Sequence, residues 1–207
     1  MTNQPNILMI VTDQEYAHQS LPAGFVLANR DRIRSRGVSF DNQYATTSVC
    51  TPSRSVMLTG RHTPHTRMFD NTNFAWIDDM KADPEALPTI GHLLRDLGYH
   101  TVYKGKWHLS EIPAEGSREA MEPYGFSEYQ DWGDAQGGPM DGLLKDPKTA
   151  DEAVDWLTKR APEVATTQPW FMTVNLVNHH DVMFFDTDGD EPVQAKRMFT
   201  FFDAPDE

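Results

Sequence analysis

The chain has 207 residues, 39% of them hydrophobic, and a chain of this length and composition can bury a substantial core. Its 31 acidic residues outnumber its 18 lysines and arginines, so the formal net charge is −13. This charge argues against a nucleic-acid-binding protein, which would carry a basic face, and against docking on an anionic membrane surface. The net charge does not exclude small anionic ligands, because a local basic cluster can override a distant net charge.

The single cysteine excludes an internal disulfide bond and gives no information about the cellular compartment. The N-terminal residues lack the basic stretch and the small-residue cleavage site of a secretory signal. The apolar run at residues 7–11 is far too short to span a bilayer. We therefore expect a cytoplasmic protein with neither a membrane nor a nucleic acid as its partner.

The first elements predicted along the chain are a strand, a helix and a second strand. Residues 7–11 are continuously apolar and are followed by Asp13 and Gln14, which suits a central strand of a parallel sheet. Residues 25–36 have a helical pattern that stops at a glycine, and residues 38–40 are typical of a short strand. Ligands of open α/β sheets bind at the carboxyl ends of the strands, where the polar pair after the first strand lies.

The middle of the chain continues this alternation. Residues 53–58 are predicted to form a helix with Pro52 at its first position and a glycine after its end. Residues 87–97 have an apolar helical face, and an alternating strand follows at residues 99–103. Residues 111–147 are rich in glycine, proline and acidic residues, which favours an elaborated surface loop.

The last predicted elements are a helix at residues 149–160, with Thr149 as its N-cap, and a buried strand at residues 169–177. His179 and His180 follow this strand. The alternation of strands and helices predicts an α/β fold with a largely parallel central sheet flanked by helices.

Cys50 lies at or before the start of a predicted helix, one turn before Arg54. Backbone N–H groups of a first helical turn favour negative charge, and a guanidinium suits bidentate contact with an oxyanion. The arrangement therefore predicts an anion site with a nucleophile-sized side chain at its mouth. The alternative is that a lone cysteine is a small buried hydrophobic residue.

The other polar positions near strand ends also have ordinary structural alternatives. A pair such as Asp13 and Gln14 after a strand is often a capping turn, and paired histidines are mostly loop residues. Lys104 and Lys106 alternate along one strand, so one of them is expected to point to solvent, and we assign Lys104 to that position.

Four ordered segments together resemble the sulfatase family, in the alkaline phosphatase superfamily. The similarity covers nearly the whole chain, and it implies the N-terminal part of a sulfatase catalytic domain with an α/β fold. The segments are CTPSR at residues 50–54, NILMIVTDQ at residues 6–14, YKGKWHL at residues 103–109 and NHHD at residues 178–181.

This resemblance implies that Cys50 is converted to formylglycine by a maturation enzyme, and that the chain is a hydrolase of small anionic sulfate esters. One hydroxyl of the hydrated aldehyde would attack sulfur and expel the alcohol. Loss of a proton from the second hydroxyl would then break the C–O bond to sulfate and restore the aldehyde. An ordinary serine or cysteine ester lacks this internal release route.

The family's metal site is implied at Asp13, Gln14 and the modified Cys50. The oxygen donors suit a divalent cation, Ca²⁺ first, with Mn²⁺ or Mg²⁺ as alternatives. Most family members have two acids where this chain has Asp13 and Gln14. The Asp-Gln pair resembles the branch with choline sulfatases and phosphonate monoester hydrolases, so a phosphonate or phosphate ester hydrolase is the alternative function.

The remaining catalytic roles are also implied by resemblance. Arg54 would hold the hydrated aldehyde, Lys106 would contact the aldehyde and the ester oxygens, and His108 would take the proton at release. His180 would contact the ester or the leaving oxygen. His179 occupies the place of the family's proline, so the choice between the two histidines stays open.

Complete sulfatases carry a second pair of metal ligands and a smaller C-terminal subdomain after these segments. The residues after His180 show neither an Asp-Asn nor an Asp-His pair. We therefore expect residues 1–207 to be the N-terminal part of a catalytic domain, without the C-terminal subdomain. A truncated, non-catalytic anion-binding fragment is the alternative, and homo-oligomerisation stays open.

Overall fold

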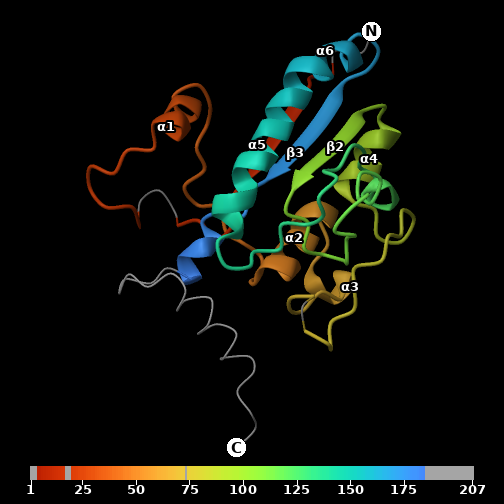
Figure 1. The fold of residues 1–207 in the computed structure, drawn as a ribbon, viewed down its shortest axis with the longest axis horizontal. Coiled ribbons are helices and arrows are strands. Elements are labelled where there is room, and N and C mark those ends of the chain that lie inside the picture. The colour runs from red at the N-terminus through yellow and green to blue at the C-terminus, as the bar shows by residue number, and fades with distance from the viewer. Residues whose placement is uncertain (1–3, 17–19, 73, 185–207) are drawn as a thin grey trace, which may run out of the picture.

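Three parallel strands form the centre of the computed structural model, which describes residues 4–16, 20–72 and 74–184 (Figure 1). The strand order is β1 (Ile7–Val11), β3 (Trp170–Asn175) and β2 (His100–Gly105). Val11 pairs with Asn175, and Asn175 pairs with Gly105, so all three strands end at one edge of the sheet. Polar residues that follow different strands therefore meet at that edge, as expected for an α/β fold.

Helices cover both faces of the sheet at β2 and β3. β1 lies at one edge of the described sheet, where Leu8 and Ile10 are 43% and 55% exposed, so it is not the central strand that its apolar run predicted. On one face, α5 (Asp141–Lys159) lies along β3 and β2 (Figure 1) and packs Ala153 and Trp156 against Val102 and Met172. The opposite face packs against α2 (Cys50–Thr59) and α4 (Ile90–Asp96). The expectation of a largely parallel sheet flanked by helices is confirmed for the described residues. The remaining elements are α1 (Ala28–Arg34), α3 (Thr63–Thr66), η2 (Glu122–Tyr124), α6 (Ala161–Val164) and η3 (His180–Phe184).

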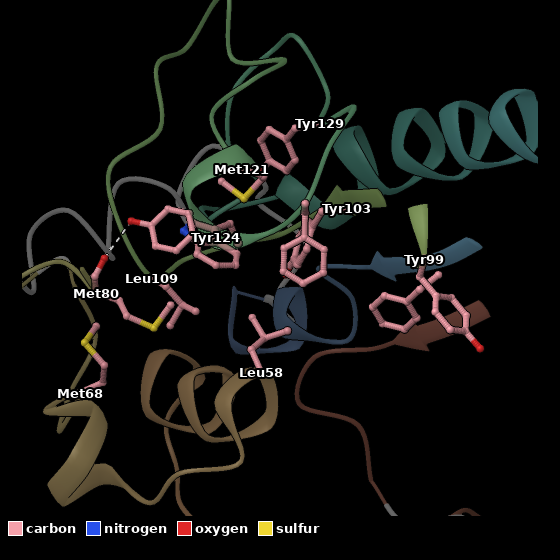
Figure 2. Close-up of a cluster of buried hydrophobic side chains, with 12 residues drawn as sticks. Leu58, Met68, Met80, Tyr99, Tyr103, Leu109, Met121, Tyr124 and Tyr129 are labelled. Atoms are coloured by element: carbon pink, nitrogen blue, oxygen red, sulfur yellow. Dashed lines mark hydrogen bonds between the residues drawn. The ribbon is translucent and has the colours of Figure 1, made fainter. Parts of the chain in front are cut away.

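The larger hydrophobic cluster lies on the α2 and α4 side and includes the residues drawn in Figure 2. The ring of Tyr103 meets Trp107 edge-on with centroids 5.3 Å apart, and Tyr124 donates a hydrogen bond to the Met80 carbonyl. Trp107 and Leu109 are completely buried in this cluster and alternate with Lys106 and His108. Truncating a buried ring such as that of Trp107 lowers the free energy of unfolding by about 3–5 kcal/mol. The cluster therefore fixes the segment that carries Lys106 and His108.

Three elements differ from the sequence expectations. Residues 38–40 form no strand, because no neighbouring strand pairs with them among the described residues, and Val38 and Phe40 are 80% and 76% exposed. The helix predicted from Thr149 begins at Asp141, and Thr149 is buried within it. The predicted loop at residues 111–147 therefore ends seven residues early and also contains η2. Composition missed the start of α5 because Asp181, distant in sequence, accepts the Leu143 N–H near that helix end.

The other predicted elements lie within a few residues of their expected bounds. α2 begins at Cys50 itself, so Pro52 is its third residue rather than its first. α4 begins after Thr89, whose hydroxyl accepts the His92 N–H while the His92 ring accepts the Thr89 N–H. No helix in the described part of the chain is both long enough and apolar enough to cross a membrane.

Candidate active site

The carboxyl ends of the strands and the N-terminus of α2 enclose a cavity of about 420 Å³. Asp13 and Gln14 follow β1, Cys50 begins α2, and His180 begins η3 after β3. The sequence analysis expected these segments to meet, and the fold brings them to one edge of the sheet. The residues that line the cavity are Asp13, Gln14, Thr47, Ser48, Val49, Cys50, Ser53, Asn71, His180 and Met183.

The Asp13 carboxylate lies at the centre of the charged groups. Lys106 Nζ lies 2.5 Å and Arg54 Nη2 3.5 Å from Asp13 Oδ2. Burial raises the pKa of the Asp13 carboxyl, but the positive charges of Lys106 and Arg54 outweigh it and hold that pKa below its ordinary value. Asp13 is therefore ionised and is neutralised by two buried cations.

Cys50 is the first residue of α2, and its Sγ lies 3.5 Å from Asp13 Oδ1 and 3.9 Å from His180 Nδ1. Burial raises the pKa of the Cys50 thiol, and the Asp13 carboxylate adds to this, although Lys106 and Arg54 oppose it. The unmodified side chain is therefore a neutral thiol that donates to Asp13. A helix N-terminus alone would have favoured a thiolate, so the local carboxylate and burial decide the outcome.

Arg54 is buried one turn along α2 and holds the strand ends together. Its Nη1 donates to the Lys106 carbonyl at 2.9 Å and to Asn175 Oδ1 at 3.4 Å. Asn175 is buried at the end of β3, and its amide nitrogen donates to Thr173 Oγ1. Sequence reasoning missed Asn175, although an amide inside the apolar run of residues 169–177 was a usable signal, because buried amides require partners.

Lys106 and His108 follow β2 and point toward the site, whereas Trp107 points into the core. Lys106 is completely buried, and His108 is nearly so. The expectation that Lys104 points to solvent is wrong. Lys104 is only 4% exposed and forms a 3.0 Å ion pair with Glu152 of α5, because that helix covers the face of β2 on which Lys104 lies.

His108 is a neutral imidazole. Burial, together with the nearby cations Lys106 and Arg54, lowers its pKa to about 3. His108 Nδ1 is buried without a hydrogen-bond partner in the described structure, and the backbone has φ 55° at this residue. A neutral ring with a free buried nitrogen can accept or donate a proton when a partner enters the site.

Of the two histidines after β3, His180 lies in the site. Its Nδ1 is 4.0 Å from Asp13 Oδ2, and burial holds its pKa below the ordinary value. His179 is exposed, and its backbone N–H donates to the Asp13 carbonyl at 2.7 Å. Gln14 lines the cavity with an exposed side chain and has φ 53°.

Two observations fit a cation or a polar ligand here. Ligand atoms of Asp13, Cys50 and His180 lie within 4.8 Å of one another. Asp13 Oδ2 and Lys106 Nζ are buried without hydrogen-bond partners in the described structure, and Asp13 Oδ2 is balanced by its charge contacts with Lys106 and Arg54. Asp13 and Gln14 offer oxygens, the donors that Ca²⁺ prefers, so the donor set fits such an ion.

Comparisons with known proteins identify the family of this chain. A family model described as Sulfatase matches residues 5–200. An N-acetylglucosamine-6-O-sulfatase of Bacteroides thetaiotaomicron is 32% identical over 149 residues, which cover 70% of this chain and 23% of that protein. A choline-sulfatase of Rhizobium meliloti is 25% identical over 226 residues, which cover 96% of this chain and 41% of that protein.

Solved structures share the fold at low identity. A 2-O GAG sulfatase has a TM-score of 0.63 at 24% identity, covering 86% of this chain and 36% of that chain. A phosphonate monoester hydrolase from Silicibacter pomeroyi has a TM-score of 0.57 at 19% identity, covering 85% and 42%. The chain spans between 20% and 41% of the length of the curated relatives it matches. Because the family match extends over nearly all of its residues, the chain belongs to the sulfatase family.

Proposed function

We propose that this chain carries the nucleophile and the anion-binding half of a sulfuric ester hydrolase that uses formylglycine derived from Cys50. The observation that carries the proposal is the contact of Cys50 Sγ with Asp13, beside Lys106 and Arg54, at the N-terminus of α2. A sulfate ester is an anion, so its hydrolysis needs fixed positive charge next to the nucleophile. Lys106 and Arg54 supply that charge without solvent screening.

The raised pKa of the Cys50 thiol supports conversion of this residue. A neutral thiol next to a carboxylate is a poor nucleophile, so the arrangement does not suit direct thiolate attack. A formylglycine at position 50 would supply a hydrated aldehyde, and a divalent cation held by Asp13 and Gln14 would lower the pKa of its hydroxyl. Arg54 and Lys106 would bind the oxygens around it.

The two buried histidines have separate tasks in this proposal. The His108 ring is neutral and its Nδ1 has no hydrogen-bond partner in the described structure, and it would accept the proton that is lost on release of sulfate. His180 Nδ1 lies 3.9 Å from Cys50 Sγ, and His180 would donate to the ester or to the leaving oxygen. His179 is exposed, so we assign this role to His180.

Maturation of Cys50 can be tested without any substrate. We expect co-expression with a formylglycine-generating enzyme to yield an aldehyde in the peptide that contains residue 50, detected by peptide mass spectrometry and by hydrazide labelling. Cys50→Ala must lose the label. A thiol in every copy of the peptide, while a control substrate of the same maturation enzyme is converted, would contradict the proposal.

Metal binding gives a second test. The described residues offer two oxygen donors, Asp13 and Gln14, besides position 50, whereas Ca²⁺ prefers six to eight oxygens. We therefore expect calorimetric titration of this chain to show weak Ca²⁺ binding that Asp13→Asn abolishes. Tight stoichiometric binding, or binding that survives the substitution, would contradict this assignment.

A phosphonate or phosphate ester hydrolase of the same superfamily is the second candidate. Gln14 favours it, because a neutral amide replaces the second acid that most sulfatases carry. An aryl sulfate and an aryl phenylphosphonate with the same leaving group, assayed side by side on the matured protein, distinguish the two functions by kcat/KM. Sulfate binding without turnover of either ester would indicate an anion-binding protein instead.

A further inference from the structure

Two carboxylates outside the cavity make the same contact with the backbone at two strand ends. After β2, Asp134 Oδ1 accepts the Trp107 N–H and Asp134 Oδ2 accepts the His108 N–H, both at 2.7 Å. Each oxygen therefore binds one of two consecutive backbone donors. Hydrogen bonds from N–H groups to an ionised carboxylate are among the stronger ones in proteins.

The same arrangement recurs after β3. Asp146 Oδ1 accepts the Val177 N–H at 2.7 Å, and Asp146 Oδ2 accepts the Asn178 N–H at 2.9 Å. Asp146 belongs to α5, whereas Asp134 lies in the loop before that helix. Two different elements thus supply one carboxylate each to neighbouring strand ends.

The contact made by Asp134 sets the direction of the first pair of site residues. His108 has φ 55°, a left-handed conformation that costs a non-glycine residue roughly 1 kcal/mol or more. The bond to its N–H holds that conformation, and with Trp107 fixed in the core the side chains of Lys106 and His108 point into the site. The Tyr129 hydroxyl donates to the Gly105 carbonyl and lies 3.3 Å from Asp134 Oδ1, which extends the support by one residue.

The contact made by Asp146 sets the direction of the second pair. The segment that it holds exchanges two backbone hydrogen bonds with Asp13, from Asp13 N–H to the Asn178 carbonyl and from His179 N–H to the Asp13 carbonyl. His180 N–H donates to the Val177 carbonyl within the same turn. A shift of residues 177–178 would therefore move Asp13 and His180 together.

We propose that Asp134 and Asp146 are a matched pair of positioning residues, Asp134 for Lys106 and His108 and Asp146 for Asp13 and His180. This inference rests on the proposed function for its catalytic consequence, but the geometry it concerns can be measured without turnover. A carboxylate is required at both positions, because an asparagine would offer one acceptor and would turn its NH₂ group toward the second backbone N–H.

The test uses Asp134→Asn and Asp146→Asn in the full chain with isotope-labelled histidine. The first variant should shift the imidazole ¹³C and ¹⁵N resonances of His108 and leave those of His180 in place. The second variant should do the reverse. Asp131→Asn and Asp151→Asn remove exposed carboxyls near the same two positions and should move neither histidine.

A general loss of stability would disturb both histidines in either variant, so only the crossed pattern supports two separate positioning roles. Equal shifts of both histidines, or no shift, would overturn the inference. If an asparagine variant does not fold, Asp134→Glu or Asp146→Glu replaces it. Glutamate keeps both oxygens on a side chain one methylene longer and should shift the same histidine.

Turnover by the matured protein then tests whether the two positioning residues affect catalysis. Each asparagine variant should lower kcat about tenfold or more, as loss of a residue that orients a ligand commonly does, while both exposed controls keep the wild-type kcat. If the variants show the crossed pattern of shifts but the matured wild-type protein turns over no ester, the proposed function alone is contradicted. Full kcat in both variants despite shifted histidines would overturn the positioning role.

Discussion

Asp13 is the residue on which the charges of the site converge. Its carboxylate contacts the Lys106 ammonium and the Arg54 guanidinium, and all three side chains are nearly or completely buried. Buried charges that lose their partner are far more costly than exposed ones, because water no longer solvates them. The stability of the fold and the electrostatics of the site therefore depend on the same carboxylate.

Removal of this carboxylate is expected to destabilise the protein. Asp13→Asn leaves Lys106 and Arg54 as neighbouring cations without a counter-charge, which should lower the free energy of unfolding by about 3 kcal/mol or more. Urea unfolding followed by circular dichroism measures the effect. Asp78→Asn removes an exposed carboxyl and should change stability by less than about 0.5 kcal/mol. Equal effects of the two substitutions would mean that the buried charge cluster is not formed.

His108 should make the protein less stable as the pH falls. Its pKa of about 3 in the folded protein lies below the ordinary 6.5, so between these values the unfolded chain binds a proton that the folded chain refuses. Stability is therefore fully present above pH 6.5 and is lost progressively toward pH 3, by on the order of a few kcal/mol from this group.

The measurement is the free energy of unfolding against pH for the wild type and for His108→Asn. Asparagine carries no titrating ring and tolerates the left-handed backbone at this position. The variant should lose less stability than the wild type between pH 6.5 and pH 4. Parallel curves would show that His108 is accessible and titrates as in the unfolded chain.

At this scale the sequence predicted which side chains gather at the sheet edge, and it missed the residues that hold them there. All seven predicted site residues lie at one edge of the sheet. Five of them follow strands whose ends meet there, and Cys50 and Arg54 belong to α2, whose N-terminus faces the same edge. Asn175, Asp134 and Asp146 were not predicted. Asp134 and Asp146 accept from backbone groups and Asn175 accepts from the Arg54 side chain, all distant in sequence, so local spacing does not predict these partners.

At the scale of elements, the junction of β2, β3 and α5 depends on one glycine. A Cβ at Gly105 would lie 1.9 Å from the Asn175 carbonyl oxygen and 2.9 Å from Thr149 of α5. Gly105 also has φ +87°, a conformation that side chains rarely adopt. The strand end that leads into Lys106 can therefore approach β3 only because this residue has no side chain.

The steric part of this requirement can be separated from the backbone part. Gly98→Ala has nearly the same φ, +86°, with no atom within 4 Å of the added Cβ, so it should cost only about 1–2 kcal/mol. Gly105→Ala adds the clash and should cost several kcal/mol more, or prevent soluble expression. Thermal unfolding of both variants gives the comparison. Similar melting temperatures would mean that β2 and β3 do not approach each other this closely.

The same junction explains why helix bounds were harder to predict than strands. Apolar runs identify β1, β2 and β3, and their predicted bounds lie close to the observed ones. Both faces of the sheet are covered at β2 and β3, whereas one face of β1 is exposed at Leu8 and Ile10. The start of α5 depends on tertiary contacts of Asp181 and Asp146, and the helix continues through Pro147, which local rules treat as a stop. Local helix propensity does not depend on those contacts, so it cannot predict where α5 begins.

At the scale of the molecule, the segment around α1 differs from the rest of the described structure. α1 contains no buried residue, and Figure 1 shows it standing apart from the sheet. Val26, Ile33 and Phe40 are 71%, 65% and 76% exposed. Scattered apolar side chains are ordinary on a surface, but several along one exposed segment favour association with other apolar groups.

This segment should therefore make the isolated chain bind apolar dyes and associate with itself. Replacing Val26, Ile33 and Phe40 together by serine should reduce the fluorescence of bound anilinonaphthalene sulfonate and shift size-exclusion elution toward the monomer. The free energy of unfolding should change by less than about 0.5 kcal/mol per site, because these side chains are exposed in the folded chain.

A core substitution provides the opposite control. Leu58 is 1% exposed in the larger hydrophobic cluster, so Leu58→Ala should lower the free energy of unfolding by about 2–5 kcal/mol while dye binding to the folded chain stays at the wild-type level. The two variants thus separate surface association from internal stability. Unchanged dye binding in the triple serine variant would mean that the side chains around α1 do not bind the dye. Unchanged elution would mean that they do not cause association, as expected if the −13 net charge keeps copies of the chain apart.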